Sequence, residues 1–188
     1  MPLVIAPAPA RSSSAQSPII IEIGPGRGDF LFHLARTDPA AIICGIEIKW
    51  RRFEKLRERR ERDRLANVAL IYGDARVAVP QLACLVDKVY VQFPDPWPKR
   101  RHAWHRILDA EFLGSCARRL KTGGEIWFIT DDKLYAESTA ALFIADPGWQ
   151  TYFAQPIVTN CPDAFPTHFA QKWRAEGRTI YYQRYKRS

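Results

Sequence analysis

Short apolar runs alternate with longer amphipathic stretches along most of this chain, and the alternation restricts the folds that it can adopt. The apolar runs predict strands and the amphipathic stretches predict helices. Strands are predicted at 19–23, 41–48, 68–72, 86–92 and 125–130, and helices at 28–36, 50–65, 110–120 and 132–145; two more strands are predicted near 151–154 and 179–185. Such alternation builds a parallel sheet with helices on both faces, so we expect an α/β fold.

The length of the chain sets its domain organisation. A chain of 188 residues, 47% of them hydrophobic, can build one domain with a sizeable core. Residues 1–17 are rich in Pro, Ala and Ser and predict a flexible tail, which leaves residues 18–188 as a single domain. No signal-peptide core and no membrane-spanning segment is predicted.

Charge and cysteine usage narrow the class of protein. The chain has 28 Lys and Arg against 20 Asp and Glu, a formal net charge of +8, which favours a polyanionic partner. Its 4 cysteines are scattered without a CxxC pair, so neither a metal site nor a disulfide framework is predicted. This pattern is typical of a protein of the reducing cytoplasm.

A glycine-rich turn joins the first predicted strand to the first predicted helix. Gly24, Gly26 and Gly28 are spaced G-x-G-x-G, and glycine lets a ligand approach both the backbone and the helix N-terminus. The turn lacks the G-x-G-x-x-G spacing of dinucleotide-binding folds, so hydride transfer is disfavoured.

Acidic residues follow the next two predicted strands. Glu47 ends the second strand, roughly 20 residues after the glycine turn, where an acid can accept hydrogen bonds from both hydroxyls of a ribose. Asp74 follows the third strand, where a carboxylate could accept from an adenine amino group. Each of them alone could be an ordinary loop carboxylate, but together with the glycine turn they predict a nucleoside site.

The segment 92–102 reads QFPDPWPKRRH and places a carboxylate in a stiff loop. Prolines at 94, 96 and 98 exclude a helix interior or a central strand. Asp95 should therefore lie just beyond the carboxyl end of a strand, where open α/β sheets bind their ligands. Trp97 adds an aromatic face, and a cationic run begins at Lys99.

These motifs resemble those of the class I S-adenosylmethionine-dependent methyltransferases, and segment 92–102 resembles the signature of the tRNA (guanine-N7)-methyltransferases. The resemblance continues at Thr130-Asp131, at Thr167-His168-Phe169 and at Gly177 and Ile180. It implies a Rossmann-like methyltransferase fold, with a mostly parallel sheet of about seven strands and an antiparallel C-terminal strand. It also implies methyl transfer from S-adenosylmethionine to N7 of a guanosine in the variable loop of tRNA.

The resemblance further implies roles for individual residues. The residues implied to bind the cofactor are Glu22, Gly24, Gly26, Glu47, Asp74 and Asp95. Those implied to bind the substrate are Lys99, Asp131 and Thr167, and Asp95 is also the implied catalytic residue. No metal is implied, and a monomer or homodimer is expected.

The chain departs from the family pattern at Ala170, where the family has a glutamate. Gln171 and Glu176 are candidates to replace that carboxylate. The departure keeps open a methyltransferase of the same fold that acts on another RNA or on a small molecule. A non-catalytic RNA-binding protein on a decayed methyltransferase fold is a second alternative, against which the intact acids at 47, 74 and 95 argue.

The densest basic run, residues 49–64, reads KWRRFEKLRERRERDR and has two interpretations. It can be a solvated helix whose charges pair at i,i+4 while Trp50, Phe53 and Leu56 turn to the core, which is the simpler interpretation. It can also be a face that contacts RNA phosphates.

Overall fold

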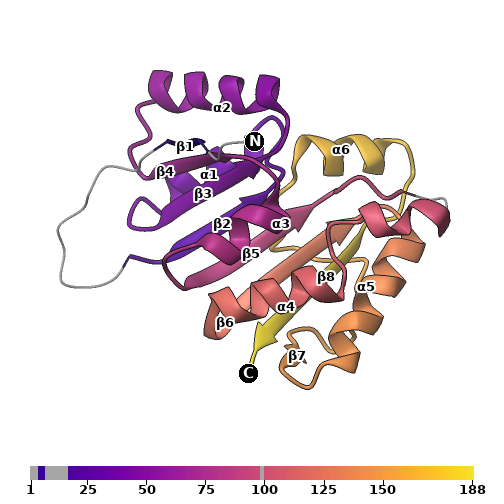
Figure 1. Cartoon of the computed structure of the whole chain (residues 1–188). Helices are drawn as coiled ribbons and strands as arrows, with labels where there is room; N and C mark the ends of the chain where they lie inside the picture. Colours follow the sequence, from indigo (N-terminus) through magenta and orange to yellow (C-terminus); the bar gives the residue numbers. More distant parts are fainter. Residues whose placement is uncertain (1–3, 7–16, 98–99) are drawn as a thin grey trace.

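The computed structural model describes residues 4–6, 17–97 and 100–188, which build one sheet with the strand order β1-β4-β3-β2-β5-β6-β8-β7 (Figure 1). The strands are β1 (Val4–Ala6), β2 (Ile19–Ile23), β3 (Ile42–Glu47), β4 (Val68–Tyr72), β5 (Val86–Gln92), β6 (Leu120–Thr130), β7 (Trp149–Thr151) and β8 (Tyr181–Arg187). Strands β4, β3, β2, β5 and β6 pair in parallel, whereas β1, β8 and β7 pair antiparallel with their neighbours. The predicted α/β fold with an antiparallel C-terminal strand is confirmed.

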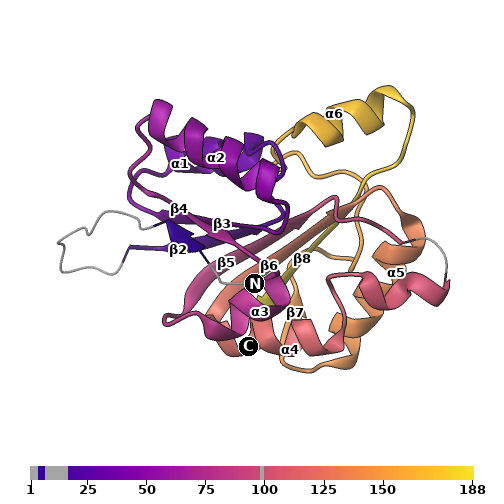
Figure 2. The ribbon, with the colours of Figure 1, turned by 45° about the horizontal axis from the view of Figure 1, so that its top comes forward.

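Helices cover both faces of the sheet, as Figure 2 shows. The helices are α1 (Asp29–Thr37), α2 (Trp50–Arg62), α3 (Ala75–Ala78), α4 (Ala110–Arg119), α5 (Lys133–Ala145) and α6 (His168–Ala175), with 3₁₀ turns η1 (Val79–Gln81) and η2 (Arg100–His105). Helices α1 and α2 bury Phe32 and Phe53 on one face of the sheet, and α4 and α5 bury Phe112 and Phe143 on the other. These two apolar clusters are the reason why β2, β3 and β4 read as mainly apolar runs.

The strand order reverses at β2, which lies between β3 and β5. Adjacent loops leave the sheet in opposite directions at such a point and open a crevice at the carboxyl ends of the strands. The glycine turn after β2, Glu47 at the end of β3 and the loop after β5 all meet at this edge. Within the described ranges, no helix is long and apolar enough to cross a membrane.

The structure differs from the sequence prediction in several places. Strand β1 lies inside the segment 1–17 that was predicted to be a flexible tail, and it pairs with β4 through Val4 and Tyr72. Helix α6 was not predicted, because it follows a Pro-rich loop and is only eight residues long. Strand β6 starts at Leu120 rather than at 125. Leu120 already pairs with Val86 of β5, and the register between the two strands shifts before the next pair, Lys88 with Glu125.

Candidate functional site

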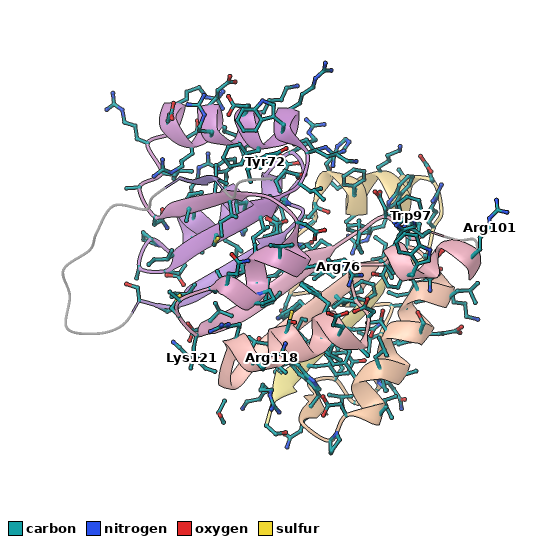
Figure 3. All side chains as sticks on the ribbon, viewed as in Figure 1. Tyr72, Arg76, Trp97, Arg101, Arg118 and Lys121 are labelled. Carbon is teal, nitrogen blue, oxygen red and sulfur yellow. The ribbon has the colours of Figure 1, made fainter. Side chains whose placement is uncertain are left out.

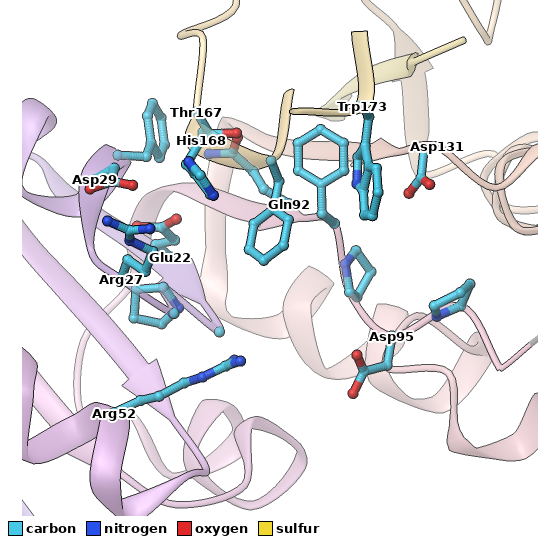
Figure 4. A pocket seen from close by; sticks show the side chains of 18 of the residues that line it. Glu22, Arg27, Asp29, Arg52, Gln92, Asp95, Asp131, Thr167, His168 and Trp173 are labelled. Atoms are coloured by element: carbon cyan, nitrogen blue, oxygen red, sulfur yellow. The ribbon is translucent and has the colours of Figure 1, made fainter. Parts of the chain in front are cut away.

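A cleft lies at the carboxyl edge of the sheet and consists of two adjoining hollows of about 270 and 240 Å³. Residues common to the linings of both hollows are Gly24, Arg52, Gln92, Phe93, Pro94 and Asp95. The hollow of about 270 Å³ is called the larger hollow, and that of about 240 Å³ the smaller hollow. Figure 4 shows the smaller hollow, with Glu22 and Asp95 on different sides of it.

Glu47 closes one end of the larger hollow and is fixed by two backbone donors. Only 2% of the residue is exposed. Its Oε1 accepts a hydrogen bond from the Lys49 amide at 2.8 Å, and its Oε2 accepts one from the Gly26 amide at 3.2 Å. The carboxylate therefore ties the glycine turn to the start of α2 and keeps its orientation towards the hollow.

The glycine turn needs glycine at the positions that border the cleft. Gly24 and Gly26 have φ of 67° and 59°, in the left-handed region that other residues rarely adopt. A Cβ at Gly24 would meet no atom of the described residues within 4 Å, so the space beside it is open. The turn thus presents bare backbone to the cleft.

Asp74 lines the same hollow as Glu47 and begins helix α3. Its Oδ1 accepts a hydrogen bond from the Arg76 amide at 2.8 Å. Arg76 itself, labelled in Figure 3, donates to Asp109 Oδ2 at 2.7 Å and so links α3 to the start of α4. Asp74 is therefore held in place through α3 and lies in the hollow where the sequence predicts it.

Glu22 lies at the smaller hollow and is the most perturbed acid of the cleft. It is 4% exposed, and its Oε2 has no hydrogen-bond partner among the described residues. Burial raises the pKa of its carboxyl from an ordinary 4.5 to about 8, and the nearby negative charges of Asp29 and Glu47 add to the shift. A buried oxygen without a donor favours a cationic or hydrogen-bond-donating ligand.

The raised pKa of Glu22 makes stability depend on pH. Between pH 4.5 and about 8 the folded chain keeps a proton that the unfolded chain releases, so this contribution is complete below pH 4.5 and is lost as pH rises through about 8. The free energy of unfolding of the wild type should fall relative to that of Glu22→Gln across this window. Urea titrations of both proteins at several pH values measure the difference, and parallel curves would contradict the assignment.

The loop after β5 holds Asp95 between two pinned ends. Phe93 has φ of 48° and donates its amide to the Ile129 carbonyl at 2.7 Å, while Arg106 donates to the Pro96 carbonyl at 2.9 Å. Asp95 itself is exposed and makes no hydrogen bond or ion pair within the described ranges. A positive φ at a bulky residue is strained backbone, which is typical of functional loops. The loop thus places at the border of both hollows a carboxylate that has no partner among the described residues.

The three residues predicted to face the substrate have different positions. Asp131 and Thr167 both line the smaller hollow, whereas Lys99 lies outside the described residues. Asp131 accepts a hydrogen bond from Arg178 at 2.8 Å, and Thr167 caps α6 by accepting one from the Ala170 amide at 3.2 Å. Both side chains are oriented by the protein, and their roles towards a substrate stay predictions.

Helix α6 explains the departure at Ala170. This residue is 3% exposed and belongs to an apolar cluster with Trp127, Ile129 and Ile180. Neither of the two candidates to replace the missing carboxylate lies at the hollows: Gln171 donates to the Pro166 carbonyl, and Glu176 pairs with Lys172 and Arg178. The side chain at 170 serves the packing of α6 against the sheet.

Sequence reasoning missed several residues of the cleft. Trp173 and Arg178 line the smaller hollow, and the Arg178 guanidinium lies 3.9 Å from the centre of the Trp173 ring. Gln92 contributes a buried Nε2 without a partner among the described residues. Phe169 and Trp173, four residues apart, would have signalled a helical aromatic face had α6 been predicted.

Comparisons with known proteins agree with this geometry. A family model described as "Putative methyltransferase" matches residues 16–183. The tRNA (guanine-N(7)-)-methyltransferase of Rubrobacter xylanophilus is 32% identical over 167 residues, which cover 88% of this chain and 75% of that protein. The enzyme of the same name from Thermotoga maritima is 34% identical over 166 residues, 87% of this chain but only 52% of that protein.

A solved structure supports the fold independently of close sequence similarity. The rRNA methylase from Streptococcus thermophilus superposes with a TM-score of 0.63 at 12% identity, covering 91% of this chain and 87% of that chain. Its likeness bears on the fold alone. The family model and the relatives show that the chain belongs to the tRNA (guanine-N7-)-methyltransferase family.

Proposed function

We propose that this chain transfers a methyl group from S-adenosylmethionine to N7 of a guanosine in the variable loop of tRNA. The observation that carries the proposal is the position of Asp95, which borders both hollows of the cleft. The larger hollow contains Glu47 and Asp74, the two acids expected for a nucleoside, and the smaller one contains two of the three residues expected to face RNA, Asp131 and Thr167. Asp95 lies where a cofactor and a base held in these hollows would meet.

The residues of the cleft fit the proposed cofactor. Glu47 presents a fixed carboxylate for ribose hydroxyls, and Asp74 keeps one oxygen that makes no hydrogen bond within the described ranges. The unpartnered oxygen of Glu22 suits an ammonium group such as that of an amino acid. When bound, S-adenosylmethionine supplies a methyl group that its sulfonium has already activated.

The protein's part in the reaction is then to position the base and to stabilise charge. Guanine N7 carries an in-plane lone pair, so no residue has to remove a proton from it, and positioning dominates. Positive charge develops on the purine, and the Asp95 carboxylate stabilises it. One unit charge pair at about 4 Å and an effective dielectric near 20 is worth roughly 4 kcal/mol, of which only the part specific to the transition state accelerates the reaction.

The target guanosine has to leave its stack. N7 in an A-form helix lies in a deep, narrow groove that side chains cannot enter. The ring of Phe169 lines the smaller hollow, and this residue is 39% exposed, so it provides a face on which an extruded base can stack. Trp97 lines the larger hollow and packs on His105, with ring centres 4.5 Å apart.

The proposal extends to the setting in which the chain works. We propose that residues 18–188 act as a single methyltransferase domain, as a monomer or homodimer, on tRNA in the cytoplasm. The net charge of +8 supports a polyanionic partner. On the side of η2, Arg101 is exposed and points away from the body of the protein (Figure 3), which supports contact with a long substrate.

Nucleoside analysis tests the proposal. The purified chain is incubated with methyl-labelled S-adenosylmethionine and unmodified tRNA, and the RNA is digested and separated. We expect label in 7-methylguanosine. Label in another nucleoside, or none while the cofactor binds, would favour a different substrate, and failure to bind the cofactor at all would favour a non-catalytic RNA-binding protein.

A further inference from the structure

Helix α2 divides into two halves whose cationic residues differ in their contacts. In the C-terminal half, Arg57 pairs with Glu54 and Glu61 at 3.1 Å each. Arg62, which follows in the last turn, pairs with Asp63 at 3.0 Å. This half has the self-paired, solvated character that the simpler interpretation of the basic run predicts.

The N-terminal half of α2 carries cations whose side chains have no partner in the part of the chain that the structure describes. Arg51, Arg52 and Lys55 are exposed, and within the described ranges their side chains form no ion pair or hydrogen bond. The first turn contains no acidic residue, and Lys49 at the N-cap makes no capping bond with its side chain. Cations at the positive end of a helix dipole cost stability, so this charge pattern is unfavourable unless an anion binds there.

Arg52 connects this cationic turn to the cleft. It borders both hollows, and Figure 4 shows its side chain reaching into the space between Glu22 and Asp95. By contrast, Arg76 and Arg178, which also line the cleft, are paired with Asp109 and Asp131. The same cleft contains the buried, unpartnered oxygen of Glu22, which independently marks it as a ligand site.

We propose that Arg51, Arg52 and Lys55 form a phosphate-binding face and that Arg52 holds the phosphate nearest to the target guanosine. The inference rests on the proposed function and adds to it the surface by which the RNA is held. A guanidinium presents paired donors that match two phosphate oxygens. The neighbouring cations, Arg51 just before it and Lys55 one turn after it on α2, lie outside the hollows, where an RNA strand that continues past the cleft would run.

The test compares Arg52→Gln with Arg62→Gln, which is the same substitution at another exposed arginine of α2. The Arg62 side chain is 70% exposed. For R52Q we expect tRNA affinity to fall about 3- to 10-fold, and the slope of log K against log salt to become shallower by about 0.7 to 0.9. The triple variant R51Q/R52Q/K55Q should lose about 2 to 3 units of slope. R62Q should keep the slope of the wild type.

Two further measurements separate this role from others. Melting temperatures of R52Q should equal or exceed that of the wild type, because the change removes a cation from the N-terminus of a helix. The affinity of R52Q for the cofactor should equal that of the wild type. A loss of cofactor affinity would assign Arg52 to the carboxylate of the cofactor and would overturn the inference. An unchanged salt slope for tRNA binding would overturn it as well. The binding of tRNA is measured without turnover. If the wild type bound tRNA but made no 7-methylguanosine, the proposed function would be contradicted, whereas the phosphate-binding face would still be supported by the binding data.

Discussion

Replacing Asp95 with asparagine is expected to lower kcat by about 100-fold and to leave cofactor affinity within about threefold. Asparagine has the shape of aspartate but cannot neutralise the positive charge that develops on the purine. The electrostatic gain of roughly 4 kcal/mol is an upper value. Solvation reduces it to about 2.7 kcal/mol, which corresponds to a 100-fold change in kcat.

The Asp95 side chain makes no hydrogen bond or ion pair within the described ranges, so D95N should melt at the temperature of the wild type. Steady-state kinetics with tRNA and calorimetric titration of the cofactor measure the two effects. Glu137→Gln, which neutralises a 52% exposed carboxylate on α5, serves as the control and should be fully active. A D95N protein with undiminished kcat would exclude the proposed charge stabilisation.

Replacing Glu47 with glutamine is expected to weaken cofactor binding by about 100-fold. Ribose hydroxyls would lose a charged acceptor, and hydrogen bonds to charged groups contribute about 1.5 to 3 kcal/mol each. The substitution also lowers the stability of the fold, because each Glu47 oxygen accepts a hydrogen bond from a backbone amide, that of Lys49 or that of Gly26. An amide group must turn its NH₂ towards one of these donors.

The same substitution should therefore reduce the free energy of unfolding by about 1 to 3 kcal/mol. Calorimetry of cofactor binding and urea unfolding give both numbers from one preparation, with the Glu137→Gln protein again as the control. If E47Q bound the cofactor as tightly as the wild type, the ribose would have to be held elsewhere in the cleft.

Much of the fold follows from local patterns in the sequence. The bounds of β2, β4 and β5 agree with the prediction, because apolar residues buried between two layers of helices mark each strand, with mainly apolar runs in β2 and β4 and spaced valines in β5. The strand β1 could not be predicted from Val4–Ala6, since a three-residue strand in a Pro- and Ala-rich segment has no period, and only its pairing with β4 defines it.

The cleft could be predicted where chain order determines position. Glu47, Asp74 and Asp95 each follow a parallel strand, and the carboxyl ends of parallel strands meet at one edge of the sheet. The position of Arg52 depends on how α2 packs, and the position of Arg178 depends on α6, so neither follows from order along the chain. The pairing of Asp131 with Arg178 spans 47 residues and has no local signal.

The proposal that N7 of guanosine accepts the methyl group can be tested at the level of a single atom. Two preparations of the same tRNA are transcribed, one with guanosine and one with 7-deazaguanosine, in which a C–H group replaces N7. Competition binding first checks that the protein binds both RNAs equally well. With methyl-labelled S-adenosylmethionine, we expect label in the guanosine-containing tRNA and none in the 7-deaza tRNA; equal labelling of both would contradict methyl transfer to N7.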